Sequence, residues 1–342
     1  MTRRSLTLLL ATVLALGLAV AGSFATVPYV ALKPGPACDT LSTCYGQQIL
    51  SFQGATAKKR SGKLFLTTVS VQDHLTLFEA IAGWISPSDA VLPREIVYQP
   101  DQTEQQNQQE NQQQMVDSQN AATTAALAYL GHKGTSTVTI SEVSATAPSN
   151  GKLNPGDLLL TVDGAAVHTP DEVRKGISAR KVGATVTIGY ERDGAKGSVT
   201  LPTIAAPDDS TRAIIGVGLG VRTEFDVNVD IKLQDVGGPS AGLMFALGIV
   251  DELGPTDLTG GLSIAGTGEI TPEGQVGAIG GIAQKMRGAK SQGATVFLVP
   301  ADNCDEAKKT KPGGITLVKV STLSGALQAL ATLRDHGTPP SC

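Results

Sequence analysis

The sequence predicts an α/β protein in three parts: an apolar N-terminal helix, a mainly-β module in the middle, and an α/β domain towards the C-terminus. Three observations support this prediction. Residues 5–32 carry no charged side chain. Residues 137–201 show the order strand, helix, hairpin, and residues 213–334 alternate short apolar strands with helical segments. Such alternation is typical of α/β folds.

The N-terminal segment, residues 1–32, is expected to be a signal anchor or a signal peptide. Arg3 and Arg4 precede the apolar run, whose most apolar part is 8–20. Ser23-Phe-Ala25 offers a cleavage site, but the uncharged run is also long enough to cross a bilayer. We favour an uncleaved single-span transmembrane helix with the arginines in the cytoplasm. The protein is then expected in the cell membrane, with the rest of the chain extracytoplasmic.

Residues 33–130 are expected to form an extracytoplasmic spacer with a strand and helices. The β-branched run at 64–71 predicts a strand, and 75–85 predicts a helix in which Trp84 packs. Residues 101–114 are rich in Gln and Asn, which indicates a solvated helix or spacer, with a mobile arm as the alternative. The helix is expected to continue from 115 to 130 and to stop at Gly131.

Residues 131–204 carry the mainly-β module. A strand at 137–143 precedes Pro155-Gly-Asp157 and Val162-Asp-Gly164; a helix capped by Thr169 follows, and then a hairpin over 184–201. This order resembles a bacterial PDZ domain. The resemblance implies that an extended peptide is added to a sheet edge, with backbone N–H groups holding its carboxylate. The loop that would do so falls at four residues: Gly131, His132, Lys133 and Gly134. The alternative is a module that only spaces or assembles the enzyme.

Ser240 lies in the segment Gln234-Asp-Val-Gly-Gly-Pro-Ser-Ala-Gly242, directly before an apolar run that predicts a buried helix up to Leu253. A serine at a helix start commonly caps the helix. Gly237 and Gly238 also let the backbone approach a ligand and direct N–H groups at an anion, as acyl transfer requires for its oxyanion. From the residues alone, cap and nucleophile remain open alternatives.

Lys285 is the candidate base. If residues 281–292 are helical, it shares one face with Ile282, Met286 and Ala289, whereas Lys290 lies outside that face. A buried lysine readily loses its charge and can accept a proton. The alternative is a lysine whose stem is buried and whose ammonium group reaches water.

Several blocks in order resemble the proteolytic domain of Lon-type serine proteases. They are Gly238-Pro-Ser-Ala-Gly242, Thr267-Gly-Glu-Ile270, Gly274-Gln-Val276 and Ile279-Gly-Gly-Ile282 with Lys285. The resemblance implies a Ser240–Lys285 dyad, with Thr267 near the lysine and Asp235 as a weaker candidate for orienting it. It covers residues 205–335, leaves 336–342 as a tail, and implies a homo-oligomer.

The composition of the chain limits which partners, which activating residue and which disulfides can be expected. The formal charge is −4 and aromatic residues make up 4% of the chain, so nucleic acid is not an expected partner. None of the four His lies in a familiar triad context, which leaves lysine as the activator. Neither a cofactor nor a metal site is predicted. Cys38 and Cys44 flank a short loop, and Cys304 with Cys342 would tie down the tail; two disulfides are expected, with the pairing open.

The sequence as a whole predicts an ATP-independent, membrane-anchored serine endopeptidase. No Gly-x-x-x-x-Gly-Lys-Ser/Thr loop occurs in the 342 residues. The combination resembles the bacterial PDZ-containing Lon-like membrane proteases, and it implies protein or peptide substrates in the envelope. One alternative is a PDZ adaptor or chaperone on a Lon-like scaffold that does not cleave, and another is an amidase that uses the same dyad.

Overall fold

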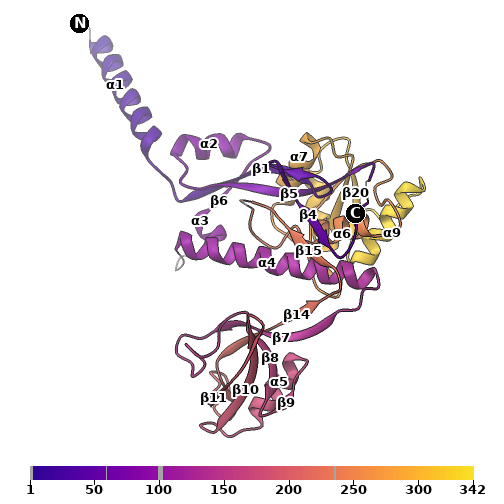
Figure 1. Cartoon of the computed structure of the whole chain (residues 1–342). Helices are drawn as coiled ribbons and strands as arrows, with labels where there is room; N and C mark the ends of the chain where they lie inside the picture. The colour runs from indigo at the N-terminus through magenta and orange to yellow at the C-terminus, as the bar shows by residue number, and fades with distance from the viewer. Residues whose placement is uncertain (1–2, 59, 99–102, 235) are drawn as a thin grey trace. The chain divides into compact units, whose positions relative to one another are not determined.

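The computed structural model of the chain describes residues 3–58, 60–98, 103–234 and 236–342. These residues form two compact units (Figure 1). The first unit comprises residues up to Gly131 together with Val227–Cys342, and the second comprises His132–Asp226. Each unit has its own sheet and its own hydrophobic core.

The first unit begins with the helix α1 (Arg3–Phe24) and then builds most of its strands and helices from two separate stretches of sequence. The first stretch contains β1 (Tyr29–Asp39), β2 (Thr43–Cys44), β3 (Gln47–Gln48), β4 (Leu50–Gln53), β5 (Lys63–Gln72), α2 (Leu77–Ile85), β6 (Ala90–Pro93), α3 (Arg94–Val97) and α4 (Glu104–Tyr129). The second contains β15 (Asn228–Ile231), α6 (Gly242–Leu253), β16 (Ser263–Gly266), β17 (Glu269–Ile270), β18 (Val276–Gly277), α7 (Ile282–Ser291), β19 (Val296–Pro300), α8 (Cys304–Thr310), β20 (Thr316–Val320) and α9 (Leu323–Arg334).

The central sheet of the first unit joins both stretches in the order β20-β19-β16-β5-β1-β6. The strands β20, β19, β16 and β5 run parallel, whereas β1 pairs antiparallel with β5 and β6. The prediction of a separate spacer over 33–130 is therefore corrected. Its strand β5 lies in the middle of the sheet, where the neighbours Leu64 and Phe65 are buried on opposite faces, and burial of both faces favours an interior position.

Two helices of the first unit carry the candidate site. The residues of α6 from Gly242 to Glu252 are all buried, so this helix is the centre of the unit. On α7 the predicted inward face is confirmed, because Ile282, Lys285, Met286 and Ala289 are all buried. The helix α4 packs against α6. The Gln-rich start of α4 is helical, and its Thr103 accepts the capping bond from Gln106.

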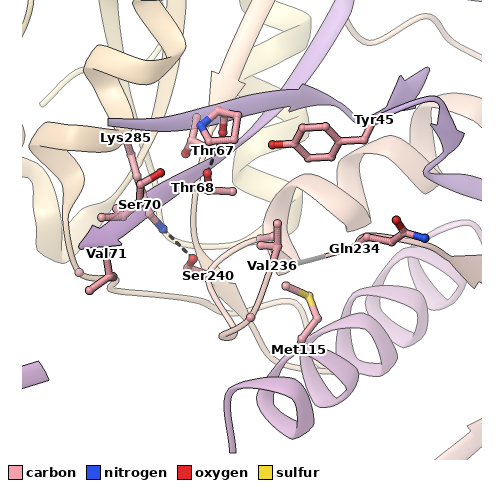
Figure 2. A pocket seen from close by; sticks show the side chains of 15 residues that line it. Tyr45, Thr67, Thr68, Ser70, Val71, Met115, Gln234, Val236, Ser240 and Lys285 are labelled. Atoms are coloured by element: carbon pink, nitrogen blue, oxygen red, sulfur yellow. Dashed lines mark hydrogen bonds between the residues drawn. The ribbon is translucent and has the colours of Figure 1, made fainter. Parts of the chain in front are cut away.

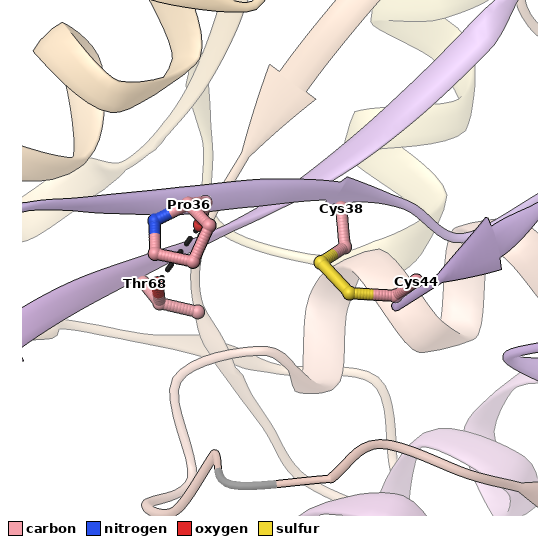
Figure 3. Close-up of a disulfide and its surroundings, with 4 residues drawn as sticks. All are labelled: Pro36, Cys38, Cys44 and Thr68. Carbon is pink, nitrogen blue, oxygen red and sulfur yellow. Dashed lines mark hydrogen bonds between the residues drawn. A yellow bond between two sulfur atoms is a disulfide. The ribbon is translucent and has the colours of Figure 1, made fainter. Parts of the chain in front are cut away.

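Two disulfides lie in the first unit. Cys38 is bonded to Cys44, which joins β1 to β2, and Cys304 is bonded to Cys342. Figure 3 shows the first of them beside the hydrogen bond from Thr68 to the carbonyl of Pro36, which spans 2.8 Å. That bond fastens the bulged part of β1 to β5.

The second unit contains the mainly-β module. Its elements are β7 (Thr135–Val143), β8 (Leu158–Val162), β9 (Ala165–Ala166), α5 (Pro170–Ser178), β10 (Thr185–Arg192), β11 (Ala195–Pro202), β12 (Ile204–Ala205), β13 (Ala213–Ile214) and β14 (Val217–Glu224). The predicted strand, helix and hairpin are all present. The sheet order β11-β10-β8-β7-β14 corrects the predicted boundary at 204. Residues 217–224 belong here because β14 pairs along the whole of β7.

Candidate active site

Ser240 lies two residues before α6, and its hydroxyl does not cap the helix. The N-cap is Ala241, which makes no side-chain cap bond. The backbone of Ser240 is instead held by its carbonyl, which accepts hydrogen bonds from the N–H of Gly268 and the hydroxyl of Thr267, both at 2.9 Å. Of the two alternatives left open by the sequence, the structure favours a hydroxyl available for chemistry.

The amine of Lys285 is hydrogen-bonded to the hydroxyl of Ser240. Its Nζ lies 2.6 Å from Ser240 Oγ and 3.0 Å from Thr267 Oγ1, as the dashed line in Figure 2 shows for Ser240. Only 3% of Lys285 is exposed, and burial lowers its pKa to about 8, against a weaker opposing effect of the negative charge of Glu269. Among the described residues no carboxylate forms a salt bridge with Lys285. A pKa of about 8 leaves about one tenth of the amine neutral at pH 7, and this form can accept a proton.

The backbone around α7 fixes the direction of the lysine. Asn303 accepts a hydrogen bond from the N–H of Ile279 and donates one to its carbonyl, both at 2.9 Å. Gly281, at the start of α7, has φ +70°, a conformation that glycine adopts without strain. A side chain on Gly281 would also collide with Val69 on β5. The helix therefore starts at a fixed point, with Lys285 one turn from its N-terminus.

The helix α4 supports the serine loop, which the sequence did not indicate. Ser118 donates a hydrogen bond to the carbonyl of Pro239 at 2.8 Å, and Gly238 donates its N–H to the carbonyl of Asn111 at 2.9 Å. Met115 lies on the same side of α4 and lines the pocket, as Figure 2 shows. The polar composition of residues 104–118 does not predict this contact. Both hydrogen bonds are accepted by backbone carbonyl oxygens, which every residue carries.

The predicted oxyanion donors are only partly in place. Gly238 has φ +84°, and its N–H is already bonded to Asn111, so its role in the structure is conformational. Gly237 lines the pocket. No acceptor among the described residues is bonded to the N–H of Ser240 itself. The prediction for Asp235 lies outside the described residues.

The pocket in front of the dyad has a volume of about 850 Å³. One wall is the end of β5, residues 67–71, and the opposite wall includes Met115 and Val236. On one side β5 pairs with β1 over Phe65–Gln72, whereas on the other it pairs with β16 only over Lys63–Leu66. Among the described strands none covers the remaining edge of β5, so a row of backbone groups faces the pocket.

The loop predicted to hold a peptide carboxylate lies between α4 and β7. Gly131 ends α4 with φ +84°, as expected of a helix stop. His132 Nδ1 lies 2.9 Å from Asp226 Oδ1, Lys133 is exposed, and Gly134 packs against Thr223. The strand that follows, β7, pairs with β8 on one side and with β14 on the other. The pairing with β8 covers only Val138–Thr139, and the edge strands of this sheet are β14 and β11. The binding of a peptide carboxylate by these four residues stays a prediction.

The N-terminal helix is long and apolar enough to cross a membrane over Thr7–Phe24, a property that a signal sequence shares. The basic residue Arg4 is exposed before this segment. No group of three or more potential metal-binding side chains lies together in the described part of the chain.

Comparison with known proteins identifies two regions. Residues 223–330 match the family model of the Lon protease (S16) C-terminal proteolytic domain, and residues 109–203 match that of the PDZ domain. Lon protease 1 of Sorangium cellulosum is 34% identical over 117 residues, which cover 33% of this chain and 14% of that protein. Lon protease 1 of Bacillus subtilis is 31% identical over 119 residues, which cover 32% of this chain and 15% of that protein. The chain thus spans about one seventh of these relatives.

Among solved structures, the PDZ domain of an SdrC-like protein from Listeria monocytogenes is 27% identical, with a TM-score of 0.23, covering 24% of this chain and 86% of that chain. The family matches include the segment that holds Ser240, Thr267 and Lys285, and the module over β7–β11. The chain therefore carries a PDZ domain followed by a serine-peptidase domain of the Lon (S16) type.

Proposed function

We propose that the protein is an ATP-independent serine endopeptidase in which Ser240 is the nucleophile and Lys285 the general base. The observation that carries this proposal is the 2.6 Å contact between Ser240 Oγ and a lysine that is 3% exposed. A serine hydroxyl is a weak nucleophile without a base, and a desolvated lysine is an accepted base for it. Thr267 holds both partners, because it contacts the amine of Lys285 and the carbonyl of Ser240.

The reaction follows from this geometry. Neutral Lys285 takes the proton of Ser240 as the oxygen attacks the scissile carbonyl, and the tetrahedral oxyanion accepts the N–H of Ser240. The resulting ammonium then gives its proton to the leaving amine, and the carbon–nitrogen bond breaks. Lys285, neutral again, takes a proton from the water that attacks the ester. It returns this proton to Ser240 Oγ as the ester bond breaks, which releases the carboxylic acid and restores the dyad. One peptide bond and one water are consumed in each cycle.

The substrate proposed for this site is an extended polypeptide. The free edge of β5 along residues 67–71 offers backbone N–H and carbonyl groups to a strand in the pocket. Strand addition of this kind requires an unfolded segment, since a folded protein has already paired its own backbone. We propose disordered segments and chain ends of envelope proteins as substrates, with the PDZ domain as a second contact for peptide.

The proposed location is the outer face of the cell membrane, with α1 as a single-span anchor. Support comes from the apolar segment Thr7–Phe24 and from the two disulfides, which form and persist in oxidising compartments. ATP-independence agrees with that location. A homo-oligomer is proposed from the resemblance to Lon-type domains alone.

Cleavage of a disordered protein such as β-casein by the full chain, followed by mass spectrometry, tests the proposal. Ser240→Ala is expected to reduce cleavage at least about 10³-fold. The matched control is Ser291→Ala on α7, whose hydroxyl is exposed and bonds only to the carbonyl of Gly288; it is expected to keep full activity. Equal cleavage by Ser240→Ala and the wild type would rule out the dyad.

An adaptor that binds without cleaving is the second candidate, because the PDZ domain is present. It is distinguished by the same two variants. An adaptor would bind casein equally in all forms and release no new chain ends from any of them, whereas the peptidase releases new ends only when Ser240 is intact.

A further inference from the structure

The helix α2 exposes its large apolar side chains and buries its small residues, the reverse of the usual arrangement in a helix on a water-exposed surface. Its inward positions are the small residues Ala80 and Gly83, and a side chain on Gly83 would collide with Val91 on β6. Its outward positions are large and apolar: Leu77, Phe78, Ile81, Trp84 and Ile85. The last two are 56% and 78% exposed. We call these five outward residues the α2 face.

The α2 face is continuous. Its residues follow the spacing i, i+1, i+4, i+7 and i+8, which places them along one side of a helix. Single exposed apolar residues are common on soluble proteins, but a contiguous set of this size marks an interaction surface. Trp84 also forms a T-shaped contact with Tyr29, with ring centroids 5.4 Å apart, so the face has a fixed aromatic end.

The N-terminus of α2 is fastened to the end of α1. Leu77 donates its N–H to the carbonyl of Ala25 at 3.1 Å, and Val27 donates its N–H to the carbonyl of Leu75 at 2.8 Å. Phe78 also packs against Gly22 in the last turn of α1. Figure 1 shows α2 beside the end of α1. The α2 face therefore begins where the apolar segment Thr7–Phe24 ends.

We propose that the α2 face lies in the headgroup and upper acyl region of the bilayer that α1 spans. If α1 crosses the membrane, the backbone bond between Ala25 and Leu77 places the start of α2 at the membrane surface. Tryptophan is enriched at that depth because its ring is apolar and its N–H is polar. An apolar helical face in the interface gains free energy in proportion to its buried area. This inference rests on the proposed anchoring by α1 and adds a second contact with lipid.

The contact would have a consequence for the pocket. The strand β5, whose residues 67–71 form the pocket wall, reaches α2 after only Asp73–Thr76. Docking α2 would hold this wall close to the lipid headgroups, which suits substrates whose extended segments leave the membrane.

Trp84 is the only tryptophan of the chain, so its fluorescence reports on the α2 face alone. The full chain is reconstituted into phosphatidylcholine vesicles in which bromine is carried near the headgroups or near the bilayer midplane. We expect a blue-shifted emission that shallow bromines quench more than deep ones. The control is Trp84→Phe combined with Tyr129→Trp at the exposed end of α4, which is expected to show little quenching by either lipid.

Vesicle flotation separates the two proposals. A chain that floats while Trp84 is quenched no more than the Tyr129→Trp control overturns the α2 inference and leaves the anchor intact. A chain that does not float overturns the anchor, and with it the inference that depends on it. Blue-shifted emission without quenching by either lipid would assign the α2 face to a second copy of the chain and also overturn the inference.

Discussion

The two ends of the buried helix α6 both hold a basic side chain in a largely dry environment, but in opposite ways. At the C-terminal end, the guanidinium of Arg60 bonds to the carbonyls of Asp251 and Gly254, and its Nε lies 3.7 Å from the carboxylate of Asp251. At the N-terminal end, the amine of Lys285 has only the hydroxyls of Ser240 and Thr267 as close partners among the described residues.

The difference shows which buried cation is structural and which is chemical. Carbonyls at a helix C-terminus, together with a carboxylate, stabilise a positive charge, and a guanidinium keeps its proton under all ordinary conditions. A helix N-terminus has the opposite polarity and disfavours an ammonium group. Burial lowers the pKa of Lys285 to about 8, so this amine changes its charge in the working range. Arg60 thus stabilises the fold, and Lys285 can accept and donate a proton.

Replacing the amine should have the largest effect. Lys285→Ala is expected to lower kcat/KM about 10²–10⁴-fold, because a general base contributes that much to proton transfer. Steady-state cleavage of a fluorogenic peptide derived from an identified casein site measures it. Lys290→Ala is the matched control, since that lysine is exposed on the same helix and contacts only the carbonyl of Gly314. Equal losses in the two variants would contradict the assignment.

Removing the structural cation should affect stability instead. Arg60→Ala leaves Asp251 buried without its partner and is expected to lower the free energy of unfolding by about 3 kcal/mol, while activity per folded molecule is retained. Chemical denaturation in detergent gives the first quantity and active-site titration the second. Arg222→Ala, an exposed arginine on β14, serves as the control with a change near zero. A shifted pH midpoint of activity in Arg60→Ala would show that the two ends of α6 are coupled.

The contact from α4 should have a smaller effect. Ser118→Ala removes the hydrogen bond to the carbonyl of Pro239 and is expected to reduce kcat about fivefold, equivalent to about 1 kcal/mol for one neutral hydrogen bond. The pH midpoint of activity should not move, because Ser118 positions the loop and does not contact a group that transfers a proton. Asn120→Ala, at an exposed position of the same helix, is expected to leave kcat unchanged. A pH midpoint that moved with Ser118→Ala would assign it another role.

The smallest effect is expected at Glu269. Its negative charge raises the pKa of Lys285 against the larger lowering by burial. With Glu269→Gln the ammonium form is less favoured, so the pKa falls and the rise of activity with pH moves to lower pH. Glu273→Gln, also exposed nearby in the sequence, is the control. A shift towards higher pH in Glu269→Gln would contradict the electrostatic account.

The sequence predicts this chemistry better than it predicts the architecture around it. The face of α7 that buries Lys285 follows from helical periodicity, which is a local property. The pairing of β5 with β16, about 200 residues away, is not local, and the spacer prediction for 33–130 was wrong for that reason. The bond from Gly238 to Asn111 uses two backbone groups, so no side-chain pattern indicates it. The edge position of β14 likewise depends on pairing with β7 across more than 70 residues.

The central claim is that Lys285 activates Ser240. A fluorophosphonate, which phosphonylates activated serines with loss of fluoride, tests it directly when its rate of reaction with the full chain is followed against pH and the modified peptide is mapped by mass spectrometry. We expect one adduct, on Ser240, formed at a rate that rises with pH to a plateau with a midpoint of about 8, as the amine of Lys285 loses its proton. A Ser240 adduct that forms at the same rate in Lys285→Ala, or an adduct on another serine, would contradict it.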